Sequence, residues 1–147
     1  MAKIEGAIVI CRPVDVVFDT VADQRNEPRY NPAMSRSEKI TDGPIGVGTR
    51  FRATTAGRRR PLDMLIEYTG FDRPHSLASS TRMAAADIHG TLTFAPHPAG
   101  TLLRWSWEVS PNRTYRLLTP LIAWLGGRLE QRTWTGLKQM LENSARL

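Results

Sequence analysis

The chain has 147 residues, of which 41% are hydrophobic and 23% charged, as expected for one globular domain over residues 1–147. Twenty basic and fourteen acidic residues give a net charge of +6. No apolar stretch approaches the roughly 20 residues of a membrane-spanning helix, no secretory pattern opens the chain, and a single cysteine, Cys11, excludes an internal disulfide. We therefore expect a cytoplasmic protein in which Cys11 is a small buried residue.

The first 30 residues predict a strand and two short helices. Residues 3–10 alternate as a strand does. Pro13 suits the first turn of a helix, where its missing N–H is not needed. An apolar face follows at helical spacing, formed by Val14, Val17, Phe18 and Val21. Pro28 and Pro32 make the second helix, residues 24–30, short and irregular.

A run of strands follows. Strand-like segments occupy residues 34–41, 48–56, 62–69, 75–83, 87–94 and 101–109. The connections between them are too short for parallel crossovers, so the sheet should be antiparallel.

A long amphipathic helix is predicted over residues 111–143, with Ser110 as N-cap and Pro111 in the first turn. Pro120 should kink this helix or split off its first turn. Gly126 and Gly127 are costly in mid-helix, and either packing or close approach of a strand or ligand can explain them. The order of elements indicates an α+β fold, a curved sheet wrapped around the last helix, which encloses a cavity for an apolar guest.

Five segments resemble one known family in the order expected of it. They are residues 8–18, 46–52, 68–74, 100–107 and 136–142. Together they are similar to the polyketide cyclase/dehydrase-like branch of the START-domain (Bet v 1-like, SRPBCC) superfamily. The resemblance implies a helix-grip fold, in which seven antiparallel strands grip the C-terminal helix. It supplies no shared catalytic motif, because members include lipid carriers, hormone receptors and cyclases. The family often has Trp where this chain has Tyr30-Asn31-Pro32.

Strand alternation selects the candidate ligand-binding residues. Trp105 and Trp107 share the inward phase of their strand, and Ser79 and Thr81 share that of Leu77. The full set that we expect at the cavity is Phe51, Tyr68, Ser79, Thr81, Phe94, Trp105, Trp107, Trp124 and Arg128. The aromatic residues can pack the core or stack on a guest. The hydroxyl and guanidinium groups can orient a ligand carbonyl or carboxylate, or be solvated and bonded to backbone.

Other motifs argue against metal, nucleophilic and dinucleotide chemistry, so no cofactor is predicted. His75, His89 and His97 lack ligand-like spacing. No Gly-x-Ser-x-Gly turn occurs, and Gly46-Val-Gly48 lacks the third glycine of a dinucleotide fingerprint.

Three functional hypotheses remain. The first is binding of a small apolar or aromatic molecule by a carrier, sensor or sequestering module, either monomer or homodimer. The second is a polyketide aromatase/cyclase-like enzyme in which Tyr68, Ser79 or Thr81 assists proton transfer. The third, weaker hypothesis is a basic module for nucleic acid or anionic membrane, centred on Arg58-Arg59-Arg60, although a solvated hairpin tip is the favoured explanation of these residues. No obligatory nucleic-acid partner is expected.

Overall fold

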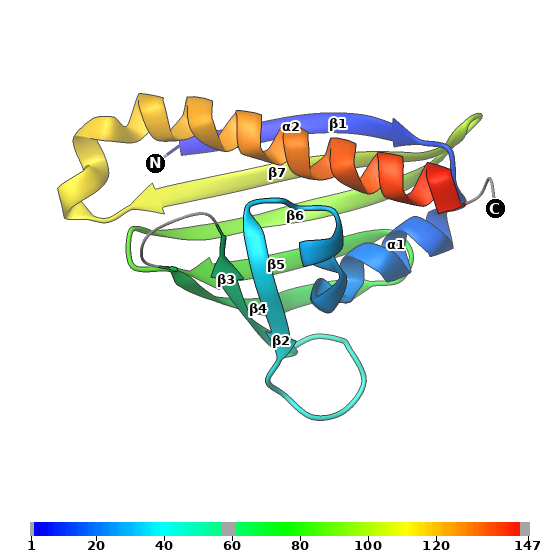
Figure 1. Cartoon of the computed structure of the whole chain (residues 1–147), viewed down its shortest axis with the longest axis horizontal. Helices are drawn as coiled ribbons and strands as arrows, with labels where there is room; N and C mark the ends of the chain where they lie inside the picture. The colour runs from blue at the N-terminus through cyan, green and yellow to red at the C-terminus, as the bar shows by residue number, and fades with distance from the viewer. Residues whose placement is uncertain (1, 57–60, 145–147) are drawn as a thin grey trace.

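The computed structural model describes residues 2–56 and 61–144, and it has the helix-grip architecture (Figure 1). The strands form one seven-stranded antiparallel sheet in the order β1-β7-β6-β5-β4-β3-β2. They are β1 (Ala2–Ile10), β2 (Met34–Lys39), β3 (Arg50–Thr55), β4 (Asp63–Asp72), β5 (Ser76–Arg82), β6 (Ala86–His97) and β7 (Gly100–Pro111). The helical segments are α1 (Val14–Ala22), η1 (Gln24–Arg29), η2 (Arg113–Leu118) and α2 (Thr119–Ser144). The α+β, helix-grip prediction is confirmed.

The start of the last helix differs from the prediction. Strand β7 continues to Pro111, which pairs with Ala86 of β6, so neither Ser110 nor Pro111 begins a helix. The turns that follow form the separate 3-10 helix η2, and α2 begins at Thr119. Pro120 therefore lies in the first turn of α2, and the predicted split of the helix at this proline is confirmed.

Cys11 is exposed, so the prediction that it is buried is wrong. It follows the last residue of β1 in the bend toward α1, outside the alternation that buries Ile10. Its backbone N–H donates a hydrogen bond to Glu142 Oε2 at 3.1 Å, which ties this bend to the end of α2.

One half of the core lies between α1 and the sheet. Phe18 of α1 makes edge-on contacts with Phe71 and Phe94, whose ring centroids lie 5.4 and 5.1 Å away. Phe51 and Tyr68 extend this cluster with centroids 5.7 Å apart. These edge-to-face pairs have the arrangement that aromatic quadrupoles favour, and they attach α1 to β3, β4 and β6.

The other half of the core is a column of three rings that joins the sheet, α2 and η1. Trp134 of α2 lies between Trp105 of β7, with centroids 6.1 Å apart, and Tyr30, with centroids 6.3 Å apart. All three side chains are buried. This column holds the second half of α2 against the inner face of the sheet.

Gly136 lets α2 approach the end of η1. A Cβ atom placed on it would lie 2.2 Å from the Tyr30 carbonyl oxygen, a backbone atom that cannot rotate away. Gly127, earlier on the same helix, has no atom within 4 Å of such a Cβ. A close contact with the backbone therefore requires glycine at position 136, whereas no such contact requires it at position 127.

Gly136→Ala should lower the free energy of unfolding by about 1–3 kcal/mol, because α2 must move away from Tyr30. Gly127→Ala should raise it by up to about 1 kcal/mol, because alanine favours the helix and has free space. Urea denaturation of the two variants measures both changes. Equal effects of the same sign would show that contact with Tyr30 does not constrain α2.

Candidate ligand-binding site

Strand register places four predicted residues on the inner face of the sheet. Cross-strand partners share a face, and one row across β4 to β7 consists of Tyr68, Ser79, Gly90 and Trp107. The adjoining row consists of Ile66, Thr81, Ile88 and Val109. Ser79, Thr81 and Trp107 therefore lie on the same side of the sheet as the buried Tyr68.

Coverage of this inner face is uneven. Leu77, Leu92 and Trp105 are buried. Four side chains of the two rows described above are only half-buried: Ser79, Thr81, Ile88 and Trp107. We call these four residues the inner patch. The difference follows α2, whose buried residues all lie in its second half, from Thr133 onward. From its first half, Ile122 and Ala123 contact the core and are half-buried.

Gly90 shapes the inner patch. A Cβ atom on Gly90 would lie 2.3 Å from Trp107 Cε3, so the indole of Trp107 occupies the place where a side chain would stand. The indole of Trp107 therefore lies across β6 at Gly90 and forms the aromatic base of the patch. Gly90 itself contributes no side chain to the patch.

A carboxyl group from α2 lies beside the two indoles. Trp134 Nε1 donates a hydrogen bond to Glu130 Oε2 at 2.7 Å. Burial raises the pKa of Glu130, and the indole N–H groups of Trp107 and Trp134 oppose that rise. The Trp107 N–H is buried and makes no hydrogen bond within the described part of the chain.

A second carboxyl group approaches from η1. Burial raises the pKa of Glu27 to about 7, and the charge of Glu130 acts in the same direction, while a hydrogen bond from Asn31 Nδ2 at 3.2 Å opposes them. Both glutamates are half-buried. Burial also raises the pKa of the neighbouring Tyr30, and the charge of Glu27 adds to the effect.

The Tyr68 hydroxyl is committed to the protein. It donates a hydrogen bond to the Ala22 carbonyl oxygen at 2.6 Å and accepts one from Gln24 Nε2 at 3.2 Å. Burial raises its pKa. A phenol with its proton held by a backbone carbonyl is a poor acid or base, which weakens the predicted catalytic role of Tyr68.

The nine residues predicted from sequence therefore occupy three environments. Phe51, Tyr68, Phe94 and Trp105 are buried in the core, and Ser79, Thr81 and Trp107 belong to the inner patch. Trp124 and Arg128 lie on the outer face of α2, so the expectation that they reach the cavity is corrected.

The reason is helical geometry. Gly126 faces β1, because a Cβ there would lie 2.4 Å from Ile4 Cδ1. Residues two positions away on either side point to other faces of a helix. Trp124 is 57% exposed, and the Arg128 guanidinium carbon lies 5.1 Å from the centre of its ring.

The sequence interpretation missed Glu27 and Glu130. A signal for Glu130 exists, because it precedes Thr133 and Trp134 by three and four residues and so shares their buried face. Glu27 gives no such signal, because η1 is short, contains Pro28 and has no regular apolar face.

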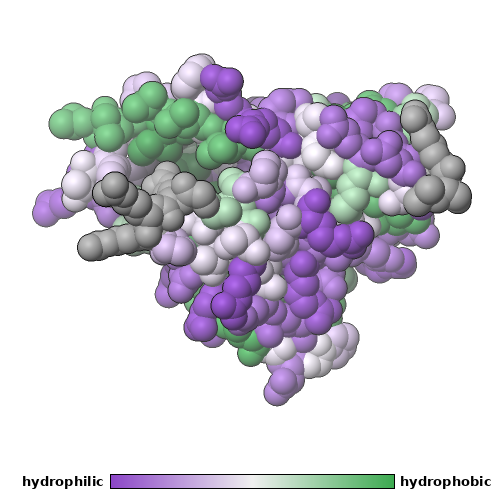
Figure 2. Space-filling view, viewed as in Figure 1, coloured by the Kyte–Doolittle hydropathy of each residue, from purple (hydrophilic) through white to green (hydrophobic). Residues whose placement is uncertain are grey.

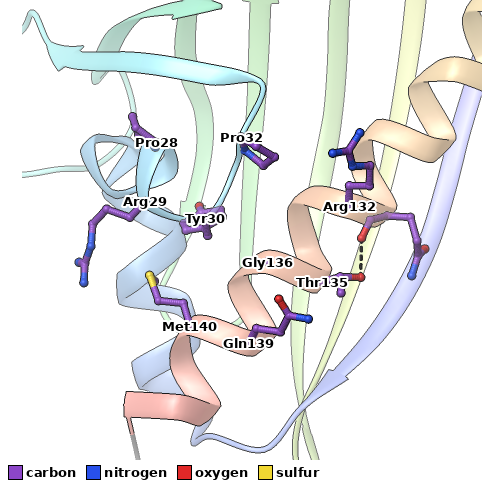
Figure 3. A pocket seen from close by; sticks show the side chains of 10 residues that line it. Pro28, Arg29, Tyr30, Pro32, Arg132, Thr135, Gly136, Gln139 and Met140 are labelled. Atoms are coloured by element: carbon purple, nitrogen blue, oxygen red, sulfur yellow. Dashed lines mark hydrogen bonds between the residues drawn. The ribbon is translucent and has the colours of Figure 1, made fainter. Parts of the chain in front are cut away.

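A surface groove of about 670 Å³ lies between η1 and α2 (Figure 3). Its lining residues are Pro28, Arg29, Tyr30, Pro32, Gln131, Arg132, Thr135, Gly136, Gln139 and Met140. Its polar groups do not converge on one point: Arg29 points away from the groove, and the Thr135 hydroxyl bonds to the Gln131 carbonyl oxygen at 2.7 Å. Ligand sites bring a few polar groups together, so the inner patch is the better candidate.

Two further predictions concern metals and the basic tip. Among residues 2–56 and 61–144, no three His, Cys, Asp or Glu side chains form a group that could hold a metal ion. No helix in these ranges has the length and apolar character needed to cross a membrane. Arg58, Arg59 and Arg60 lie outside the described residues.

A family model described as "Polyketide cyclase / dehydrase and lipid transport" matches residues 1–142. The chain belongs to this family. The resemblance inferred from sequence is confirmed. A comparison with curated proteins finds no matching sequence.

Solved structures show the same fold for this family member. A START superfamily protein from Mycobacterium smegmatis matches with a TM-score of 0.82 and 13% identity, over 97% of this chain and 99% of the other. The protein TTHA0849 from Thermus thermophilus matches with a TM-score of 0.81 and 16% identity, over 97% and 98%. Ara h 8.0201 matches with a TM-score of 0.67 and 14% identity, over 92% and 97%.

The raised pKa of Glu27 should make this family member less stable as the pH rises. In the unfolded chain the carboxyl ionises near its ordinary pKa of 4.5, whereas in the folded protein it keeps its proton up to about pH 7. The folded state therefore binds more protons between these values, and its stability is full below pH 4.5 and falls until about pH 7, by about 2–3 kcal/mol. Chemical denaturation across this pH range measures the fall.

Glu27→Gln should remove the part of this slope that Glu27 contributes and leave the part from Glu130, whose pKa is also raised, whereas Glu108→Gln, an exposed change on β7, should leave the whole slope intact. Asp19, Asp23 and Glu142 do not mask the effect, because their pKa values are lowered and their contributions are lost only in more acid solution. An unchanged slope in Glu27→Gln would show that this carboxyl ionises normally.

Proposed function

We propose that this protein binds a small apolar or aromatic molecule between the sheet and the first half of α2, as a carrier, sensor or sequestering module. The observation that carries the proposal is the half-buried inner patch, which lies within the fold on a face where the neighbouring residues are fully buried. Membership of a family described by cyclase, dehydrase and lipid transport supports it. A cytoplasmic location stays a prediction.

The inner patch has the chemistry of a site for a mainly apolar guest with one or two polar groups. Trp107 and Ile88 offer aromatic and aliphatic contact area, which supplies most of the binding energy in such sites. Ser79 and Thr81 offer hydroxyl groups that can orient a carbonyl oxygen. Phe51, Tyr68, Phe94 and Trp105, which were predicted as ligand contacts, form the packed layer that keeps this face rigid.

Ligand binding should have an affinity near the micromolar range, about −8 kcal/mol, and should raise the melting temperature. Fatty acids, polycyclic aromatics and an environment-sensitive dye can be screened by dye displacement and thermal denaturation. Thr81→Trp fills the inner patch and should weaken binding by more than about tenfold, since apolar contact area is lost to the indole.

Ser80→Trp is the matched control, because residue 80 neighbours Thr81 on β5 and points to the opposite face of the sheet. It should bind as the unaltered protein does. The proposed site would be contradicted if none of the screened ligands changed the dye fluorescence or the melting temperature of the protein. Equal binding by Thr81→Trp and Ser80→Trp would contradict it as well.

A second candidate function is acid–base catalysis on a carbonyl compound, in the manner of polyketide aromatase/cyclases. One observation favours it: Glu27 has a pKa of about 7 and lies near a second buried carboxyl group, Glu130. A group that is half-protonated near neutral pH can both accept and donate a proton during an aldol cyclisation or a dehydration. In this second function Glu27 and Glu130 transfer the protons, and Tyr68 does not.

Glu27→Gln should then lower turnover of a poly-β-ketone substrate by about 100-fold or more, as loss of a general base does. Tyr68→Phe should have a smaller effect, because its hydroxyl serves the Ala22 carbonyl. Product profiles from single-turnover reactions measure both. Identical products with and without the protein would exclude this function for the substrates used and leave ligand binding untouched.

A further inference from the structure

A cluster of exposed apolar side chains occupies η2 and the first half of α2. Figure 2 shows it as a continuous hydrophobic area over the segment where η2 leads into α2. We call it the leucine face, and it consists of Leu117, Leu118, Leu121, Trp124, Leu125 and Leu129. Leu117 is 96% exposed, and the other five are each exposed by 45–57%. Soluble monomers seldom leave so many large side chains together in water.

The spacing of these residues makes one stripe of the helix. Leu118, Leu121, Leu125 and Leu129 follow each other at intervals of three and four residues, which is the period of one helical face. The side of this half of α2 that faces the sheet lies about a quarter of a turn away around the helix, where Gly126 meets Ile4 of β1. Ile122 and Ala123 make the contacts of this half of α2 with the core, and the neighbouring stripe stays exposed.

The exposed charged residues of the segment that bears the leucine face all have one sign. Between Glu108 and Glu130 the chain has no acidic residue, and Glu130 points toward Trp107 and Trp134 in the interior. Four exposed arginines flank the stripe: Arg113, Arg116, Arg128 and Arg132. An apolar stripe whose own segment carries arginine as its exposed charged residue is complementary to a surface that is apolar inside and anionic at its rim.

Trp124 adds a group suited to a membrane interface. Its indole is over half exposed and stacks under the Arg128 guanidinium at 5.1 Å. Tryptophan prefers the headgroup level of a bilayer, where its ring is apolar and its N–H is hydrated. Arginine beside it can extend to the phosphates while its methylene groups cover apolar surface.

A second copy of the chain fits this face less well. In a symmetric dimer the same patch meets itself, so the arginines of both copies would border one interface with no carboxylate from the same stretch to pair with them. Like charges brought together in this way oppose association.

We propose that the leucine face docks on the surface of an anionic lipid bilayer, with α2 lying in the plane of the interface. The inference concerns a surface and does not require the proposed ligand. It also differs from the basic-tip hypothesis, because the residues that carry it lie on η2 and α2 rather than at Arg58-Arg59-Arg60.

The test is binding of the full chain to vesicles at near-physiological salt, by co-sedimentation and by the blue shift of tryptophan emission. Vesicles of phosphatidylcholine with phosphatidylglycerol should bind the protein, and vesicles of phosphatidylcholine alone should bind it much more weakly. The double variant L121S/L125S should bind more than about tenfold more weakly. R113S/R116S should lose about 25-fold on the anionic vesicles, because each arginine near such a surface contributes about a factor of five.

Matched controls alter the same residue types elsewhere on the surface. Val47→Ser changes a residue that is 69% exposed in the β2–β3 connection, and Arg52→Ser changes an exposed arginine of β3. Neither should affect vesicle binding. All altered residues are exposed, so melting temperatures should stay near that of the unaltered protein.

Three outcomes would overturn the proposal. One is no binding to anionic vesicles, and another is binding that L121S/L125S and R113S/R116S leave unchanged. The third is a dimer in light scattering that L121S/L125S dissociates while vesicle binding is absent, which would assign the face to a second copy. Loss of docking with ligand binding retained would leave the proposed function standing.

Discussion

The stacking of Trp134 between Trp105 and Tyr30 is the contact on which the rest of the fold depends. It joins three parts that are distant in sequence: strand β7, the C-terminal helix and the end of the short helix η1. The same indole donates its N–H to Glu130, so one side chain positions both the helix and a carboxyl group. Without it, α2 would lose its aromatic contacts with both β7 and the end of η1.

The position of this column explains why the inner face is half covered. Beyond Trp134, α2 is fastened to the end of β1 by Lys138, which donates to the Val9 carbonyl oxygen at 2.8 Å, and by Arg12, which donates to the Leu141 carbonyl oxygen at 2.9 Å. Before Trp134, the only buried residue of the described helix is Thr133. The second half of α2 covers the core. The first half has no buried residue, so the inner patch beneath it stays half-buried and the leucine face on its surface stays exposed.

Much of the fold could be predicted from the alternation of apolar and polar residues along the strands. Each strand buries one face, so its sequence repeats with a period of two residues. The inward phase of Ser79, Thr81 and Trp107 follows directly from it. The start of the last helix could not be predicted, because Pro111 is compatible with both the end of a strand and the first turn of a helix. Glu27 was missed because its raised pKa depends on contacts with η1 and α2 that are remote in sequence. Trp124 was expected at the cavity because it is an aromatic residue of an amphipathic helix, but Gly126 faces the sheet in its stead.

The glycine pair at the middle of α2 has a consequence for how the protein opens. Glycine has the weakest helix propensity after proline, and Gly126 and Gly127 fall between the fastened half of α2 and the start of the helix, which bears Leu121, Trp124 and Leu125. Separation of residues 119–127 from the sheet would expose Ile122 and Ala123 without disturbing the tryptophan column. Such a partial opening costs less free energy than global unfolding, because few buried contacts are lost. If this segment separates, the bend falls at two adjacent residues without side chains, Gly126 and Gly127.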